Sequence, residues 1–169
     1  MTNPLPLMKV SAEPRLFVFE SDAKTTAEVA LGWLDAGLTV RVVRGRKMRT
    51  VQGLFDEIAA ALQFPYYFGE NWPALNECLA DMDWLPRGSG IVIVVLDAGE
   101  VLVEEPQVEL EAFIRSIVNA SETYAQAIDE GEWWDRPAVP FHVVLQSSSL
   151  GVLIARWQQA GASVARLGA

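Results

Sequence analysis

The chain has 169 residues, of which 51% are hydrophobic and 21% charged, a composition typical of one folded domain and not of a disordered segment. No apolar run approaches the ~18 residues that a membrane-spanning helix needs, so we expect no membrane insertion. The net charge of −9 disfavours direct nucleic-acid binding, because that activity needs a basic face.

The acidic residues are concentrated in the middle of the chain. Residues 51–140 hold seventeen Asp and Glu against three Arg, a net charge of −14, whereas residues 1–50 carry +3 and residues 141–169 carry +2. Such a segment would steer a basic protein partner toward itself. The same acidity would also serve solubility alone, so charge by itself leaves both interpretations open.

The start of the chain lacks the long apolar segment of a secretory signal peptide, and the one cysteine, Cys78, cannot form an internal disulfide. We therefore expect a cytoplasmic protein. Pro4 and Pro6 lie in a segment with little pattern, which predicts a flexible leader over residues 1–13 followed by a single domain over 14–169.

Strand and helix patterns alternate along the domain. Strands are predicted over 16–19, 38–43, 91–96, 141–145 and 163–167, and helices over 22–36, 51–62, 73–82, 108–129 and from serines 147–149 to 160, with a short helix at 101–103. The first helix is expected to bury Ala27, Ala30, Leu31 and Leu34. Residues 91–96 are six apolar residues in a row, as in a strand covered on both faces. The alternation predicts an α/β fold in which helices flank a largely parallel sheet.

The stretch 64–83 combines aromatic residues, a glycine and carboxylates around a predicted helix start. Asn71 is a good N-cap, and a proline at 73 is tolerated in the first turn. The helical spacing of Leu75, Cys78, Leu79 and Met82 predicts a buried stripe. The opposite face then carries acidic residues, and Gly69 is expected to permit a sharp turn before the helix.

Exposed aromatic rings beside carboxylates have the composition of a protein-binding hot spot. We predict that ten residues bind a partner: Tyr66, Tyr67, Phe68, Glu70, Asn71, Trp72, Pro73, Asn76, Glu77 and Asp81. The alternative for Tyr67, Phe68 and Trp72 is that they pack in the core, and Cys78 is interpreted as structural.

Other candidate chemistry in the sequence is weak. The basic run at 44–49 is interpreted as a solvated turn, with phosphate contact as the alternative. His142 lies inside a predicted strand and is interpreted as a core or edge residue. No phosphate loop or metal-ligand cluster is apparent, so no cofactor or metal is expected. Glu70 and Glu77 could act as an acid/base pair, but paired acids are common on solvated helices, and we do not expect an enzyme.

The string Tyr-Phe-Gly-Glu-Asn-Trp-Pro-Ala-Leu-Asn-Glu-Cys-Leu at 67–79 resembles the signature of the barstar family, Tyr-Tyr-Gly-Glu-Asn-Leu-Asp-Ala-Leu-Trp-Asp-Cys-Leu. The residues identical in type are Gly69, Glu70, Asn71, Ala74, Leu75, Cys78 and Leu79. The resemblance covers about 38–146 and implies a barstar-like parallel sheet, with an extra N-terminal strand and helix and a C-terminal helix outside it.

Members of that family are small bacterial inhibitors of ribonucleases, so the resemblance implies an immunity protein that plugs a basic active site with an acidic helix and an aromatic loop. Glu77 and Tyr67 match a contacting acid and a contacting aromatic residue of the family, whereas Pro73, Asn76 and Arg115 replace other contacts. The alternative is an interaction module of the same fold whose basic partner is not a nuclease.

Overall fold

The computed structural model describes residues 2–10 and 16–168. Within these residues, five strands form one parallel sheet in the order β2-β3-β4-β1-β5. The strands are β1 (Leu16–Glu20), β2 (Thr39–Arg44), β3 (Ile91–Leu96), β4 (Phe141–Ser147) and β5 (Val164–Arg166). The predicted α/β fold with a parallel sheet flanked by helices is confirmed.

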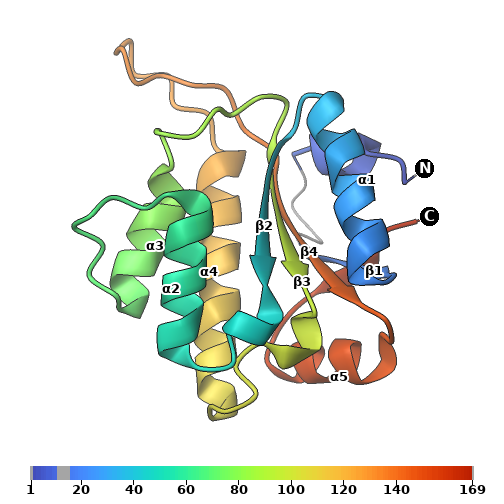
Figure 1. Cartoon of the computed structure of the whole chain (residues 1–169). Coiled ribbons are helices and arrows are strands. Elements are labelled where there is room, and N and C mark those ends of the chain that lie inside the picture. The colour runs from blue at the N-terminus through green and yellow to red at the C-terminus, as the bar shows by residue number, and fades with distance from the viewer. Residues whose placement is uncertain (1, 11–15, 169) are drawn as a thin grey trace.

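Helices cover both faces of the sheet (Figure 1). The helices are α1 (Ala23–Asp35), α2 (Val51–Leu62), α3 (Trp72–Asp81), α4 (Gln107–Ala125) and α5 (Gly151–Gln159). Short 3-10 helices form at η1 (Leu5–Met8) before β1, at η2 (Gly45–Lys47) after β2 and at η3 (Ala98–Glu100) after β3. Residues of α2, α3, α4 and α5 share one apolar cluster, and α1 belongs to a second cluster on the opposite face. Because α3 packs chiefly on α4 and not on the sheet, it is placed at the outside of its layer.

The central strand β3 has side chains in both apolar clusters. Ile91, Ile93 and Val95 pack in the cluster with α2 to α5, whereas Val92 and Val94 pack in the cluster with α1. All five are at most 4% exposed, which agrees with the prediction of a strand covered on both faces.

Helix α1 buries a different face from the predicted one. Thr26, Ala30 and Trp33 are buried, whereas Leu31 and Leu34 are exposed. Both faces have helical spacing, and the burial of the large Trp33 indole against the sheet decides between them. The predicted burial of Ala27, Leu31 and Leu34 was therefore wrong.

Part of the predicted leader packs on the domain. Residues 5–8 form η1, and Leu7 is completely buried in the cluster around α1. Residues 1 and 11–13 of the leader lie outside the described residues. The flexibility of the leader and the division into domains stay predictions.

Several helix ends differ from expectation. Helix α4 ends at Ala125, and the short helix predicted at 101–103 is found at 98–100, while Val101 and Leu102 fill the core. The serines predicted to cap α5 do not cap it, because Ser147 and Ser149 bond to each other and leave Leu150 as the N-cap. None of the described helices is both long and apolar enough to cross a bilayer.

Candidate functional site

The ten predicted site residues lie in the loop between α2 and α3 and along α3 (Figure 1). Gln63 ends α2 by taking a left-handed conformation with φ of 55°. The chain then passes along the outside of the helical layer before α3 begins. The loop and α3 therefore present one continuous stretch of the sequence at the outer side of the domain.

The start of α3 is built as predicted. The Asn71 side-chain oxygen accepts a hydrogen bond of 2.8 Å from the backbone N–H of Ala74, and its amide donates to the Gly69 carbonyl at 3.1 Å. Pro73 lies in the first turn, where its missing N–H costs nothing. The predicted stripe of Leu75, Cys78, Leu79 and Met82 is buried, which confirms the orientation of the helix.

The sharp turn before α3 is made by Glu70 and not by Gly69 as expected. Glu70 has φ of 50°, an unusual value for a residue with a side chain. Its carboxylate accepts a 2.7 Å hydrogen bond from the Gln52 amide of α2, which holds the side chain while it stays exposed. The strain at Glu70 and its tether place a carboxylate at the edge of the site.

Two aromatic rings of the loop are free to contact a partner. Tyr66 is 100% exposed and Tyr67 is 69% exposed, and their rings meet edge to face with centroids 5.6 Å apart. The alternative that Tyr67 packs in the core is therefore wrong. Rings that are exposed yet held against each other lose little side-chain entropy on binding.

Phe68 and Trp72 are half-buried and help to build the site. Both rings pack edge to face on Phe55 of α2, at 5.8 Å and 5.1 Å between centroids. The Trp72 indole N–H donates a 2.8 Å hydrogen bond to Glu109 at the start of α4. These contacts tie the loop and α3 to α2 and α4, so both residues serve packing and offer a partner only their exposed edges.

Carboxylates line the outward face of α3 and continue past its end. Glu77, Asp81 and Asp83 are exposed, and Arg87 pairs with Asp83 at 2.5 Å. Partial burial, and then the adjacent charge of Asp83, raise the pKa of Asp81 above its ordinary value. Three carboxylates thus lie near one cation, Arg87. A basic partner would reduce the remaining repulsion among the carboxylates.

The neighbouring positions are less open. Pro73 is exposed, but Asn76 is half-buried, and its side-chain oxygen is buried without a hydrogen bond within the described part of the chain. Asn76 was predicted on the exposed face, so the structure corrects this placement. Asn76 precedes the buried Leu79 by three positions, so it lies beside the buried stripe and not at the centre of the exposed face.

A residue far along the chain anchors the end of α3. The hydroxyl of Tyr124 on α4 accepts a 3.1 Å hydrogen bond from the Met82 N–H, and its ring lies 5.2 Å from the guanidinium carbon of Arg136. Burial raises the pKa of Tyr124, so its hydroxyl stays protonated. Sequence reasoning missed Tyr124, as it missed Gln52 and Glu109, since periodicity indicates burial but not the partner of a polar group.

The remaining candidates have structural roles. In the basic run 44–49, Arg44 pairs with Glu57 at 2.7 Å, and Arg49 pairs with Glu100. Mutual hydrogen bonding lowers the pKa of Glu57 and raises that of Arg44. His142 is buried in β4, as expected for a core histidine, with its Nε2 2.9 Å from the Lys9 carbonyl oxygen.

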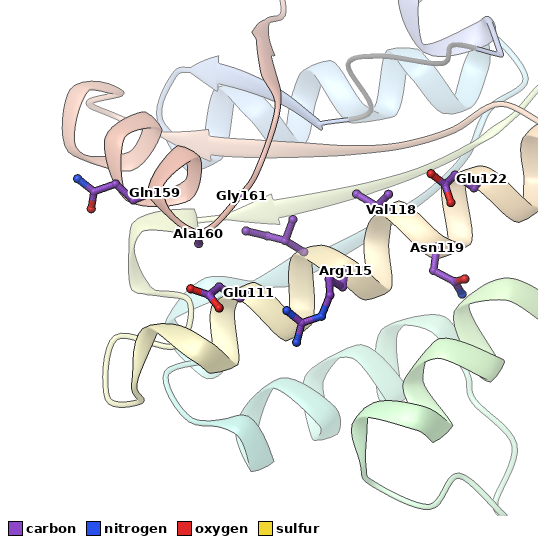
Figure 2. A pocket seen from close by; sticks show the side chains of 9 residues that line it. Glu111, Arg115, Val118, Asn119, Glu122, Gln159, Ala160 and Gly161 are labelled. Carbon is purple, nitrogen blue, oxygen red and sulfur yellow. The ribbon is translucent and has the colours of Figure 1, made fainter.

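An open hollow of about 670 Å³ lies between α4 and the end of α5 (Figure 2). Arg115 and Glu122 of α4 line it, with residues 159–161 on the other side. Its charges are of both signs, and none of the ten predicted site residues lines it. The hollow is therefore separate from the predicted binding surface.

The sequence of this domain matches a known protein family. A sequence model of the barstar family, described as Barstar (barnase inhibitor), matches residues 38–146, which is well over half of the chain. The chain belongs to the barstar family. The match begins just before β2 and ends in β4, so β1, α1, α5 and β5 lie outside it.

No curated protein matches the chain. Among solved structures, Cdc6p from Pyrobaculum aerophilum is similar, with a TM-score of 0.54 and 20% identity over 91% of this chain and 38% of that one. A structure of Drosophila ORC bound to AT-rich DNA and Cdc6 has a TM-score of 0.49 and 12% identity, over 90% of this chain and 48% of that one. The chain thus spans less than half of these proteins, and the first likeness shows a shared fold alone.

Barstar membership accounts for the parts of the surface that set its shape. The residues that match the family signature include Gly69, Asn71, Leu75, Cys78 and Leu79, and the structure gives them the cap and the packing described above. The family is one of enzyme inhibitors. Glu70 and Glu77, the residues of the acid/base alternative, are both exposed, whereas a general acid with a raised pKa is usually shielded from water.

Proposed function

We propose that this barstar-family protein binds a ribonuclease and occludes its basic active site with α3 and the preceding aromatic loop. The acidic face of α3 would enter the cleft that normally holds RNA phosphates. Glu77 would take the place of a phosphate against active-site Arg or Lys side chains, and Tyr67 would cover the cleft beside it. Inhibition would then follow from exclusion of the substrate.

The observation that carries the proposal is an exposed helix face on which carboxylates outnumber the cations that could neutralise them. Glu77 and Asp81 lie one helical turn apart on that face, and neither has an ion pair among the described residues. The cap at Asn71 and the packing of Trp72 hold the face in place before binding. A preorganised acidic surface associates quickly and loses little entropy with a cationic partner.

The test is titration of the purified protein into barnase and into a panel of other secreted bacterial ribonucleases, with RNA cleavage and calorimetry as readouts. We expect stoichiometric inhibition of at least one nuclease. Glu77→Ala should weaken binding by roughly 2–5 kcal/mol, the scale for a desolvated charge pair. The matched control is Glu28→Ala, which removes an exposed acid from α1 on the opposite face of the sheet.

Absence of any bound nuclease, or equal effects of the Glu77 and Glu28 variants, would refute the proposal. The alternative function is an interaction module of the same fold with a non-nuclease partner. It is favoured by Pro73, Asn76 and Arg115, which stand where the family has other contact residues. Affinity capture with the native chain, with the Glu77→Ala variant as competitor, separates these two functions. Only an inhibitor retains a ribonuclease.

A further inference from the structure

The loop between α4 and β4, residues 126–140, projects from the end of the domain at which α3 ends (Figure 1). Ile128 and Arg136 exchange two backbone hydrogen bonds of 2.8 Å and 3.0 Å, so the loop is a narrow hairpin. The buried Arg136 side chain clamps its base by donating to the carbonyl oxygens of Thr123 and Gln126, at 3.1 Å and 2.9 Å. The loop therefore has a defined shape.

The tip of this hairpin is also ordered by hydrogen bonds. The Asp135 carboxylate accepts from the backbone N–H groups of Glu130, Gly131 and Glu132, at distances of 2.8–3.2 Å. These bonds lower the pKa of Asp135. The Trp134 indole N–H donates to the Glu130 carboxylate at 2.9 Å. The turn is thus fixed before any partner arrives.

Two tryptophans stand at this tip. Trp133 is 88% exposed and Trp134 is 42% exposed, and their rings meet edge to face with centroids 5.5 Å apart. Neither ring contributes to the two apolar clusters of the domain. An ordered loop that holds a large apolar surface in water has no folding benefit from it, and tryptophan is the residue type most enriched among binding hot spots.

The charges around the rings indicate what they bind. Asp129, Glu130, Glu132 and Asp135 all lie within four residues of Trp133 in the sequence, whereas the one basic residue of the hairpin, Arg136, is buried at its base. Carboxylates are repelled by anionic lipid surfaces but attract cations. An arginine guanidinium can lie over an indole face and pair with a flanking carboxylate in the same contact.

The hairpin is also connected to the surface of α3. Tyr124 stacks under Arg136 at the base of the hairpin and accepts the Met82 N–H at the end of α3. Asp81 and Asp83, at the end of α3, are close enough to Tyr124 that their negative charges help to raise its pKa. The end of α3 and the base of the tryptophan hairpin therefore lie next to each other.

We propose that the hairpin carrying Trp133 and Trp134 is a second contact element, which binds an arginine-bearing surface of a protein partner beside the site occupied by α3. Recognition of arginine follows from the hairpin alone. The further statement that the partner is the same ribonuclease rests on the proposed function. In this arrangement α3 fills the cleft of the partner, and Trp133 contacts the partner at the rim of that cleft.

The test follows the indole N–H signals of the ¹⁵N-labelled full chain at 150 mM salt during titration with a nona-arginine peptide. We expect the Trp133 and Trp134 signals to shift, and Trp133→Ala to weaken peptide binding at least fivefold, with Trp133→Phe restoring much of it. The control is Val152→Ala, which removes a side chain of 82% exposure from α5 and should change nothing. Trp133 lies at an exposed tip, so its replacement should leave the fold intact.

Unchanged peptide affinity in Trp133→Ala would overturn the proposal. So would shifts of these signals with zwitterionic phosphatidylcholine vesicles in place of the peptide, since that result would assign the tryptophans to a membrane. A second arm measures binding to the nuclease found in the inhibition panel, where Trp133→Ala should cost about tenfold. If no nuclease binds, the proposed function fails while the peptide arm still decides the role of the hairpin.

Discussion

Replacing Asp81 by asparagine should make the free protein more stable while making it a poorer binder. Asp81 lies on the outward face of α3, and burial together with the charge of Asp83 raises the pKa of Asp81. Asparagine keeps the shape of the side chain and removes the charge. At pH 7 the free energy of unfolding should therefore rise by about 0.5 kcal/mol, the scale of one solvent-screened like-charge contact.

The pH dependence has a defined sign. A pKa raised in the folded state means that the folded protein holds this proton more tightly than the unfolded chain does. The stabilisation by protonation is therefore present at low pH and is lost as pH rises through the folded pKa of Asp81. The advantage of Asp81→Asn over the native chain should accordingly grow as pH rises from below this pKa to neutrality.

The assay is urea unfolding followed by tryptophan fluorescence at several pH values, together with calorimetry against a bound ribonuclease. Binding should weaken by about 2 kcal/mol, which is roughly 30-fold. The matched control is Asp83→Asn, which also removes the ion pair with Arg87 and should give less or no stabilisation. A loss of stability in Asp81→Asn at pH 7, or an advantage that grows toward acid, would refute the reasoning.

Two further substitutions test the supports of the α3 surface, and a third tests the close packing of η2. Trp72→Phe removes the hydrogen bond to Glu109 and should cost about 1–2 kcal/mol of unfolding free energy by chemical denaturation. Tyr124→Phe leaves the Met82 N–H without its acceptor, should cost about 1–3 kcal/mol, and should increase hydrogen exchange at the end of α3. Gly45→Ala would place a Cβ atom 2.2 Å from a carbonyl oxygen, and should lower stability by about 1–3 kcal/mol without changing the residues of α3.

Each of these expectations has an outcome that contradicts it. Native-like stability of Trp72→Phe would mean that the bond to Glu109 contributes nothing. Unchanged exchange in Tyr124→Phe would remove Tyr124 as the anchor of α3. A stable Gly45→Ala would show that η2 shifts away from the chain at the end of β3 without cost.

Local rules predicted the helix that forms the site because its determinants lie within it. The Asn71 cap and the stripe ending at Met82 depend on residues three and four positions apart, and both were confirmed. The apolar run at 91–96 likewise contains the information that it is buried on both faces. The barstar resemblance over 67–79 rested on the same contiguous residues.

Tertiary contacts decided between alternatives that the local sequence pattern allowed equally. Helix α1 offered two apolar stripes, and only the sheet beneath it selected Trp33 over Leu31. The serines before α5 were satisfied by their own turn, so the cap predicted from composition did not form. Exposure of Tyr67 and burial of the Asn76 oxygen also depended on neighbours from other elements.

The family, the parallel α/β fold and the acidic character of the surface all follow from the sequence, through a contiguous motif, periodicity and charge. The side chains that hold that surface in place were identified only from contacts in the folded protein. Gln52 positions Glu70, Glu109 holds Trp72 and Tyr124 anchors Met82, each across 18 or more residues of sequence. Periodicity cannot predict such pairs, because the partner of a polar group is set by distance in space and not by distance along the chain.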